Sequence, residues 1–370
     1  METLDIIVPT YRLETAPLRA ILSLAPPAGV RTRWLIVIDN PCSALPPEVA
    51  AMCDRESVDV IRNERNLGSA GARNTALDRS QGEWVLFLDD DVAPAPNLLV
   101  RYEAAVARNP NATGFFGPTR FQPAQTRYQR GVEASDILTF FRLAEQACEL
   151  AWAPTSNVLV RGAVARLERF RTVFPKGGGG EDIDYLLRVS RRHGGAFIAE
   201  PSAVVEHPWW FEGRRDYTRF MRWSYGDSLL HDLHPEFTYR SAPNAIEVLA
   251  VGLPVTGAIA AATGTLMPMF ALAGGVVVGE LLVEFSRLCA LKSWRDAVFC
   301  METVLIRSAN DLGRVSMQLR LGRLHGITER WDHFCNGEHV SYHKRWSAIK
   351  FAAHLLFSGV LAAGFAALHS

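Results

Sequence analysis

The hydrophobic positions of the first hundred residues fall into four short, nearly continuous runs. These runs are LDIIVPT, RWLIVID, VDVIRN and EWVLFLDDD, and helix-compatible stretches such as residues 16–24 and 70–79 separate them. Continuous Ile, Val and Leu indicate strands that are covered on both faces, and strands that alternate with helices are typical of parallel sheets. The pattern therefore predicts an α/β domain with a mostly parallel central sheet and helices on both faces.

The pattern changes further along the chain. Residues 111–210 continue with looser α+β patterning, but Val248 to Gly279 is a run of 32 residues without Asp, Glu, Lys or Arg. Such a run exceeds the roughly 20 residues that cross a bilayer, and its internal prolines and glycines favour two short passes or a re-entrant hairpin. We expect a first domain over residues 1–240 and a helical, membrane-associated region over 241–370, with hydrophobic segments at about 246–283 and 347–368.

The charges around these apolar segments predict their orientation. Ser286 to Trp346 holds ten Lys or Arg against six Asp or Glu, and positive charge between hydrophobic segments belongs on the cytoplasmic side. Apolar residues at helical spacing over 298–319 favour an amphipathic helix at the membrane surface. The alternative is a soluble helical subdomain with a very apolar core, because Lys350 and His354 interrupt the last apolar run.

Composition adds three expectations. The formal net charge is zero, so there is no electrostatic argument for a nucleic-acid partner. The six cysteines are scattered without a CxxC pair, which favours reduced thiols. The first residues, METLDIIVPTYR, lack the pattern of a secretory signal, so the first domain is expected in the cytoplasm, at the cytoplasmic face of a membrane.

Polar groups follow each predicted strand where it ends. In parallel sheets ligands bind at the carboxyl ends of the strands, so these groups predict one nucleotide-sized site. Asp89, Asp90 and Asp91 follow the fourth strand, and a divalent cation would relieve their mutual repulsion; a helix cap or a solvated turn is the alternative. The other strand ends carry Pro9, Thr10, Tyr11, Asp39, Asn40, Arg62 and Asn63.

A second acidic pair follows the four glycines at 177–180. Glu181 and Asp182 fall in the first turn of a helix that the apolar spacing of EDIDYLLRV predicts. Acidic residues in that position also favour the helix dipole without any chemistry, which is the alternative interpretation. The preceding glycines predict a mobile loop.

Five motifs in order resemble a known family. IIVPTYR, VIDN, NLGSAGARN, FLDDD and GGEDIDYLLR, across about residues 3–225, look like the signature of family 2 glycosyltransferases with the GT-A fold, the fold of nucleotide-diphospho-sugar transferases. The resemblance implies an inverting enzyme that moves a sugar from a nucleotide-diphosphate donor to an acceptor hydroxyl. The membrane-associated region makes a lipid-linked or membrane-delivered glycan or glycolipid the expected acceptor.

The resemblance also implies roles for individual residues. Asp89 and Asp91 would bind Mn²⁺ or Mg²⁺ at the donor diphosphate, and Asp90 would accept from ribose hydroxyls. Asp182 would be the catalytic base, with Glu181 structural or acceptor-binding. The expected substrate-binding set is Pro9, Thr10, Tyr11, Asp39, Arg73, Asp90, Glu181, Trp209 and Trp210.

Several of these assignments have alternatives. Asp39 would contact the base, but IDNPCS departs from the usual motif and leaves the base identity open. Arg73 would donate hydrogen bonds to a base carbonyl or a phosphate; the alternative is a solvated charge on a helix. Trp209 and Trp210 form a sugar platform or pack under the sheet. His207 is expected as a third metal ligand beside the two aspartates, against a structural histidine at a strand end.

Other activities are less consistent with the motifs. The first strand lacks GxGxxG, which excludes a nicotinamide enzyme, and a sugar nucleotidylyltransferase needs a glycine-rich loop that is missing. RFMRW at 219–223 has Arg219 where processive synthases have Gln, so one or a few sugars per acceptor are expected. The remaining alternative is a non-catalytic GT-A-like binding or scaffold protein in a membrane glycan assembly complex.

Overall fold

The computed structural model describes residues 1–369, and the chain divides into two compact units. Unit 1 comprises residues 1–124 and 138–212, and unit 2 comprises residues 125–137 and 213–370. The units divide the chain earlier than the predicted boundary near residue 240, because α9 (Thr218–Leu233) and the short α5 (Arg127–Ala134) pack within the C-terminal unit.

Unit 1 is built on an eight-stranded sheet in the order β3-β2-β1-β4-β9-β6-β10-β8. Its first four strands are parallel, as their continuous apolar runs predict, and β9 inserts antiparallel between β4 and β6. The strands are β1 (Thr3–Thr10), β2 (Arg31–Ile38), β3 (Val58–Arg62), β4 (Trp84–Leu88), β6 (Gly114–Phe116), β8 (Glu149–Leu150), β9 (Asn157–Arg161) and β10 (Phe197–Ala199). A second sheet joins β5 (Ala93–Pro94), β11 (Val205–His207) and β7 (Thr119–Phe121).

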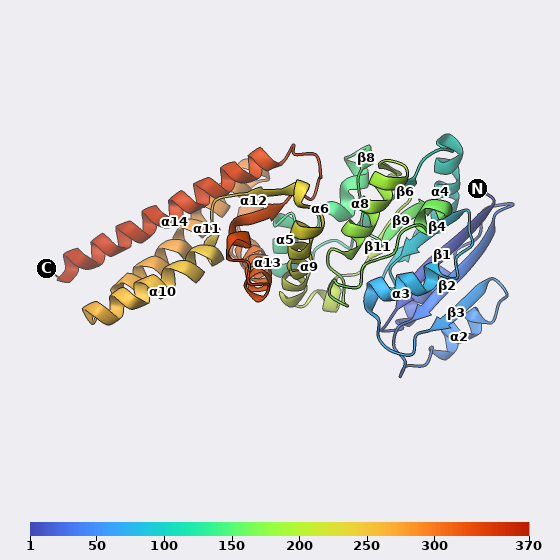
Figure 1. Ribbon diagram of the computed structural model, residues 1–370, viewed down its shortest axis with the longest axis horizontal. Helices are drawn as coiled ribbons and strands as arrows, with labels where there is room; N and C mark the ends of the chain where they lie inside the picture. Colours follow the sequence, from blue (N-terminus) through green and yellow to red (C-terminus); the bar gives the residue numbers. More distant parts are fainter. Residues whose placement is uncertain (370) are drawn as a thin grey trace. The chain divides into compact units, whose positions relative to one another are not determined.

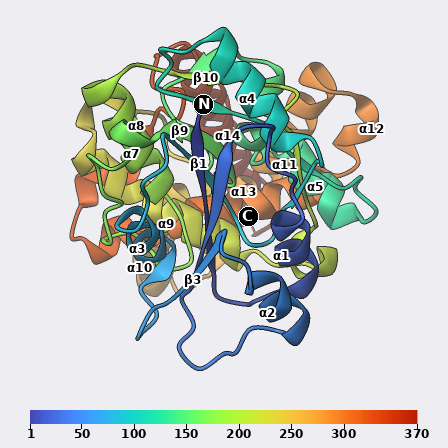
Figure 2. The same ribbon diagram turned by 90° about the vertical axis from the view of Figure 1, so that its right-hand side faces the viewer.

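Helices cover both faces of the larger sheet, as predicted (Figures 1 and 2). Alternate residues of a strand point to opposite faces, so Ile6 and Leu86 pack in the core beneath α1 and α4, while Phe87 contacts Tyr185 of α8 on the other face. The helices of unit 1 are α1 (Thr15–Leu22), α2 (Pro47–Cys53), α3 (Gly68–Leu77), α4 (Leu98–Arg108), α6 (Thr139–Arg142), α7 (Gly162–Ala165) and α8 (Glu181–His193), with short turns η1 (Leu143–Glu145) and η2 (Trp210–Gly213).

Over its described residues, unit 2 is helical apart from one small two-stranded antiparallel sheet. Three of its helices, α10, α11 and α14, are long and apolar enough to cross a membrane. The predicted break in the charge-free run is confirmed, since α10 ends at Thr263 and α11 begins at Met267. Its elements beyond α5 and α9 are η3 (Pro235–Phe237), β12 (Thr238–Arg240), α10 (Ala245–Thr263), α11 (Met267–Leu291), α12 (Trp294–Ala297), α13 (Cys300–Arg320), η4 (Leu324–Thr328), β13 (Glu329–Trp331) and α14 (Val340–His369).

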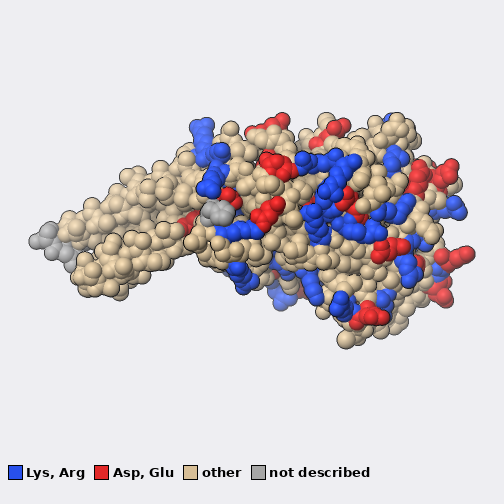
Figure 3. Space-filling model, viewed as in Figure 1, with Lys and Arg blue, Asp and Glu red and all other residues tan. Residues whose placement is uncertain are grey.

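On the face shown in Figure 3, the visible surface of the long apolar helices is almost free of charge. Exposed apolar side chains cover it, among them Val255 and Val360, each more than half exposed. A water-facing helix bundle exposes polar residues instead, so this surface favours a membrane-associated region over a soluble helical subdomain. All six cysteines are free of disulfide bonds in the structure.

Candidate active site

The carboxyl ends of the parallel strands bring the predicted polar residues of unit 1 together. Thr10, the last residue of β1, donates its hydroxyl hydrogen to Asp90 Oδ2 at 2.6 Å, which ties the end of β1 to the end of β4. Pro9 is half-buried within β1, and Tyr11 follows it with half of its surface exposed. Pro9, Thr10 and Tyr11 therefore lie at the carboxyl ends of the parallel strands, where a ligand is expected.

Asp39, at the end of β2, is buried and holds the loop before α3. Its carboxylate accepts from Asn63 Nδ2 at 2.7 Å and from the backbone N–H groups of Leu67 at 2.9 Å and Gly68 at 2.7 Å. Gly68 has φ +78°, and a Cβ there would lie 2.7 Å from Lys176 Cα. Asp39 therefore shapes the loop, and its expected contact with a base stays a prediction.

Arg73 is the centre of a buried ion network rather than a solvated helix charge. It donates to Asp89 Oδ1 at 2.8 Å and to Glu181 Oε1 at 3.2 Å, and its guanidinium lies 5.5 Å from the centre of the Phe170 ring. Burial lowers the pKa of Arg73, but the charges of Asp89 and Glu181 outweigh burial, so its pKa lies above the ordinary value. The guanidinium is thus a fixed cation between the two acidic motifs.

Glu181 has partners on both of its oxygens. Oε1 also accepts from Ser69 Oγ at 2.7 Å, and Oε2 accepts from the backbone N–H of Gly179 at 2.6 Å. Gly178, Gly179 and Gly180 all have positive φ, which lets the loop fold back over this carboxylate. Among the two roles expected for Glu181, this geometry favours the structural one.

Asp182 differs from its neighbour, because its carboxylate has a single hydrogen-bond donor among the described residues. One oxygen accepts from the N–H of Ile183 at 2.9 Å, and the side chain is half-buried. Burial and the negative charge of Glu181 raise the pKa of Asp182 to about 7, against the opposing effect of Arg73. A carboxyl group with this pKa exchanges protons readily near neutral pH, as a general base requires.

The three consecutive aspartates lie in different surroundings. Burial and the charge of Asp91 raise the pKa of Asp90 to about 7, although its hydrogen bond from Thr10 opposes the rise. Burial also raises the pKa of Asp89, and Arg73 only partly offsets it. Each of these carboxyl groups would therefore be stabilised by an additional positive charge.

Asp91 meets His207 at the end of β11. The distance from Asp91 Oδ1 to His207 Nε2 is 3.2 Å, and Arg12 lies 3.4 Å from the other oxygen of Asp91. His207 Nδ1 bonds to the Pro208 carbonyl, while Trp210 Nε1–H points to His207 Nε2 at 3.2 Å. Only a protonated Nε2 can donate to Asp91, whereas an unprotonated Nε2 accepts from Trp210 through its one lone pair. Burial lowers the pKa of His207, but the hydrogen bond and the charge of Asp91 outweigh burial, so its pKa lies above the ordinary value.

How well the site fits a metal ion depends on the pair formed by Asp91 and His207. No group of three or more His, Cys, Asp or Glu side chains within the described chain is arranged to hold a metal. Asp91 Oδ1 and His207 Nε2 nevertheless converge as one hard and one borderline donor, a combination that suits Mn²⁺ when a diphosphate supplies further oxygens. Asp89 Oδ1 accepts from Arg73, so Asp91 and His207 are the two members of the expected three-residue ligand set that face each other, and the role of Asp89 as a ligand stays a prediction.

The two tryptophans have separate surroundings. Trp209 is buried, donates to the Gln122 carbonyl at 2.8 Å and packs 5.3 Å from the Phe121 ring, which agrees with the packing alternative. Trp210 is half-buried and bonds to His207, so it orients the imidazole. Sequence reasoning expected Asn63 at these strand ends but missed Arg12 and Ser69 as partners of the site acids, although both lie within the quoted motifs.

Comparison with known proteins agrees with this arrangement. Residues 5–166 match the model of the family described as "Glycosyl transferase family 2". The chain carries a family 2 glycosyltransferase domain. The larger sheet and its helices, with Asp89, Asp90 and Asp91 after the end of β4, have the arrangement expected of the GT-A fold.

Relatives of the family 2 domain act in several bacteria. An uncharacterized glycosyltransferase of Haemophilus influenzae is 33% identical over 139 residues, which cover 37% of this chain and 46% of the relative. The succinoglycan biosynthesis protein ExoM of Rhizobium meliloti is 29% identical over 224 residues, 55% of this chain and 66% of the relative. The chain thus spans less than two thirds of the length of either relative.

Solved structures are similar at a lower level of identity. The mannosyltransferase PcManGT from Pyrobaculum calidifontis, in complex with GDP-Man and Mn²⁺, is 18% identical with a TM-score of 0.49 over 83% of this chain and 86% of that one. TarS of S. aureus is 14% identical with a TM-score of 0.45 over 86% of this chain and 92% of that one.

Proposed function

We propose that the chain is an inverting glycosyltransferase that transfers one or a few sugars from a nucleotide-diphosphate sugar to an acceptor hydroxyl. The observation that carries this proposal is the contrast between neighbouring acids, because Glu181 is saturated by donors while Asp182 has a pKa of about 7. One carboxylate is thus held for structure and the other is available to take a proton. This division matches the needs of a base-assisted attack in a family 2 domain.

In the proposed reaction Asp182 takes the proton of the acceptor hydroxyl as its oxygen attacks the anomeric carbon. The bond from that carbon to the donor phosphate oxygen breaks, and the nucleoside diphosphate leaves with the electron pair. Attack from the side opposite the leaving group inverts the configuration. Arg73 holds Asp89 in place, and the Thr10 to Asp90 hydrogen bond positions a carboxyl group for the ribose hydroxyls.

A divalent ion, Mn²⁺ or Mg²⁺, is part of the proposal. Asp91 and His207 would hold it, with Asp89 joining if its bond to Arg73 opens on donor binding. The ion would stabilise the negative charge that develops on the leaving diphosphate. The Trp210 N–H would have to release His207 Nε2 when the ion binds, because it donates to the lone pair that the ion would use.

The acceptor is proposed to be a lipid-linked or membrane-delivered glycan or glycolipid. The support is the presence of three apolar helices in unit 2, together with relatives named for polysaccharide biosynthesis such as ExoM. The excess of Lys and Arg over 286–346 supports placing the catalytic domain on the cytoplasmic face.

The test is a donor panel with full-length protein in detergent and Mn²⁺, measuring release of nucleoside diphosphate and the anomeric configuration of the product. Asp182→Asn is expected to remove turnover, and Asp54→Asn, at an exposed carboxyl group distant in sequence from the motifs, is the matched control. Donor binding without turnover in the wild type, over a panel of acceptors, would favour the scaffold alternative. A product that retains the donor configuration would contradict the inverting mechanism.

A further inference from the structure

The amphipathic helix α13 of unit 2 has an apolar side without a protein partner in the described chain. Five large side chains on or just before this helix are more than two fifths exposed: Val298, Met301, Leu305, Leu312 and Leu319. Their spacing of three, four and seven residues places them on one side of a helix. Ser308 and Ser316 share this side, so it is apolar with a few small hydroxyl groups.

Other sides of α13 are packed against neighbouring helices of unit 2. Gly313 touches α9 so closely that a Cβ would lie 2.3 Å from the Met221 carbonyl oxygen. Thr303 donates to the Gly131 carbonyl of α5 at 3.4 Å, and Asn310 donates to the Phe220 carbonyl of α9 at 3.3 Å. The exposed residues are offset from Asn310 and Gly313 around the helix, so the apolar stripe points away from α9.

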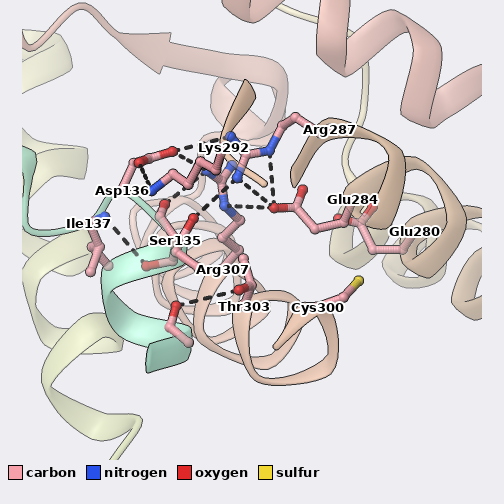
Figure 4. Close-up of polar contacts among 12 residues, drawn as sticks. Ser135, Asp136, Ile137, Glu280, Glu284, Arg287, Lys292, Cys300, Thr303 and Arg307 are labelled. Carbon is pink, nitrogen blue, oxygen red and sulfur yellow. Dashed lines mark hydrogen bonds and ion pairs between the residues drawn. The ribbon is translucent and has the colours of Figure 1, made fainter. Parts of the chain in front are cut away.

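A cluster of ion pairs locks α13 to the apolar helix α11 (Figure 4). Arg307 of α13 lies 3.6 Å from Glu284 of α11, and Arg287 lies 2.7 Å from the same carboxylate. Arg287 and Lys292 also reach Asp136, at 3.1 and 2.6 Å. Glu284 is fully buried and also pairs with Lys350 of α14 at 3.0 Å, so Arg307 is the residue of α13 that joins this charged cluster on α11.

These contacts show that α13 runs across the apolar helices rather than along them. Arg307 meets Glu284 of α11, and Arg314 pairs with Glu247 in the first turn of α10. The two arginines are seven residues apart, or about 10 Å along the helix, which matches the roughly 8–10 Å between the axes of two packed helices. Cys300 donates to the Leu281 carbonyl. The contacts between the two helices therefore advance by seven residues along α13, from Cys300 to Arg307, but by only three residues along α11, from Leu281 to Glu284.

We propose that the apolar stripe of α13 lies on the surface of the lipid bilayer that α10, α11 and α14 enter. A helix that crosses membrane-spanning helices lies near the membrane plane, and the stripe lies on the side of α13 opposite Arg307 and Arg314, which leaves it open to lipid. The two ends of the stripe carry side chains that bind lipid headgroups: the exposed Arg295 and Arg320 suit phosphates, and the strongly exposed Trp294 suits the interface. This inference rests on the proposed membrane association.

The test is the depth of fluorescent labels in full-length protein reconstituted into nanodiscs of zwitterionic and anionic phospholipids. Leu305→Cys and Leu312→Cys carry an environment-sensitive dye, Val255→Cys on α10 reports membrane insertion itself, and Glu48→Cys in unit 1 reports water. Serine replaces the three exposed native cysteines, Cys42, Cys148 and Cys289. Each label is quenched in parallel by a lipid with a spin label near the headgroup and by aqueous iodide.

The expected result is that the lipid quencher lowers the emission of the Leu305 and Leu312 labels by about twofold or more, as it does for the Val255 label, while iodide acts mainly on the Glu48 label. Iodide quenching of the α13 labels as strong as that of Glu48 would overturn the inference. Protection from both quenchers would also overturn it, since that outcome indicates a protein partner on the stripe. Failure of the Val255 label to respond to lipid would instead show that membrane association is wrong.

Discussion

Replacing Asp182 with Asn is expected to stabilise the fold at alkaline pH while it removes activity. The pKa of this carboxyl group rises from 3.8 to about 7 in the folded protein, so the unfolded chain ionises first as pH rises. Stability is therefore lost between about pH 4 and pH 7, and the full cost applies above pH 7. At about 1.4 kcal/mol for each tenfold change in proton affinity, the cost is at most about 4 kcal/mol.

An uncharged Asn removes this cost, because it has the size of the carboxyl group and keeps an oxygen that can accept from the N–H of Ile183. Loss of the general base is expected to lower turnover by about 10² to 10⁴, while donor affinity changes little. The assay pairs turnover with thermal unfolding at pH 5 and pH 8. We expect a higher melting temperature for Asp182→Asn than for wild type at pH 8 and a smaller difference at pH 5.

Asp54→Asn is the matched control, because it removes one carboxylate from an exposed position. It is expected to leave both turnover and the pH dependence of unfolding unchanged. A lower melting temperature for Asp182→Asn at pH 8, together with normal turnover, would refute the reasoning and assign Asp182 a structural role. An equal increase at both pH values would show that the ionised carboxylate is not the cause.

Three further predictions concern the metal site and the loop before α3. Asp91→Asn, like Asp89→Asn, should abolish divalent-dependent transfer without unfolding the protein, and transfer that persists in EDTA would contradict the metal assignment. His207→Ala should weaken activation by Mg²⁺ more than by Mn²⁺, where the carboxylates hold the tighter-binding ion; equal activation constants for wild type and variant in both metals would remove His207 from the site. Gly68→Ala should cost about 1–3 kcal/mol of unfolding free energy, since φ is +78° and its Cβ would overlap Lys176; denaturant unfolding checks this, and an unchanged midpoint would show that the loop adapts.

Much of unit 1 follows from its residue pattern. The four apolar runs became β1 to β4, because continuous Ile, Val and Leu cannot be covered on one face only. The carboxyl ends of neighbouring parallel strands share an edge, so the polar residues after those strands were expected together, and the Thr10 to Asp90 bond confirms it for β1 and β4. The start of α8 at Glu181 also follows from local spacing and the preceding glycines.

Local sequence patterns did not reveal which acidic side chains already have hydrogen-bond donors or a positive charge beside them in the folded protein. Glu181 and Asp182 are adjacent in the chain, yet only the fold determines that Ser69 and Arg73, more than a hundred residues earlier, donate to the first. Burial of Arg73 likewise depends on Phe170 and on the loop that Asp39 holds. These contacts involve residues far apart in sequence, and no periodicity encodes their distances.

In unit 2 the sequence by itself determined the apolar helices, since a run of 32 residues without charge has no stable place in water whatever the rest of the chain does. Only the tertiary structure decided which side of α13 remains exposed and that the helix crosses α10 and α11. The physical reason is that hydrophobic periodicity specifies a side of a helix, whereas its direction depends on partners such as Glu284 and Glu247, which lie far away in the chain.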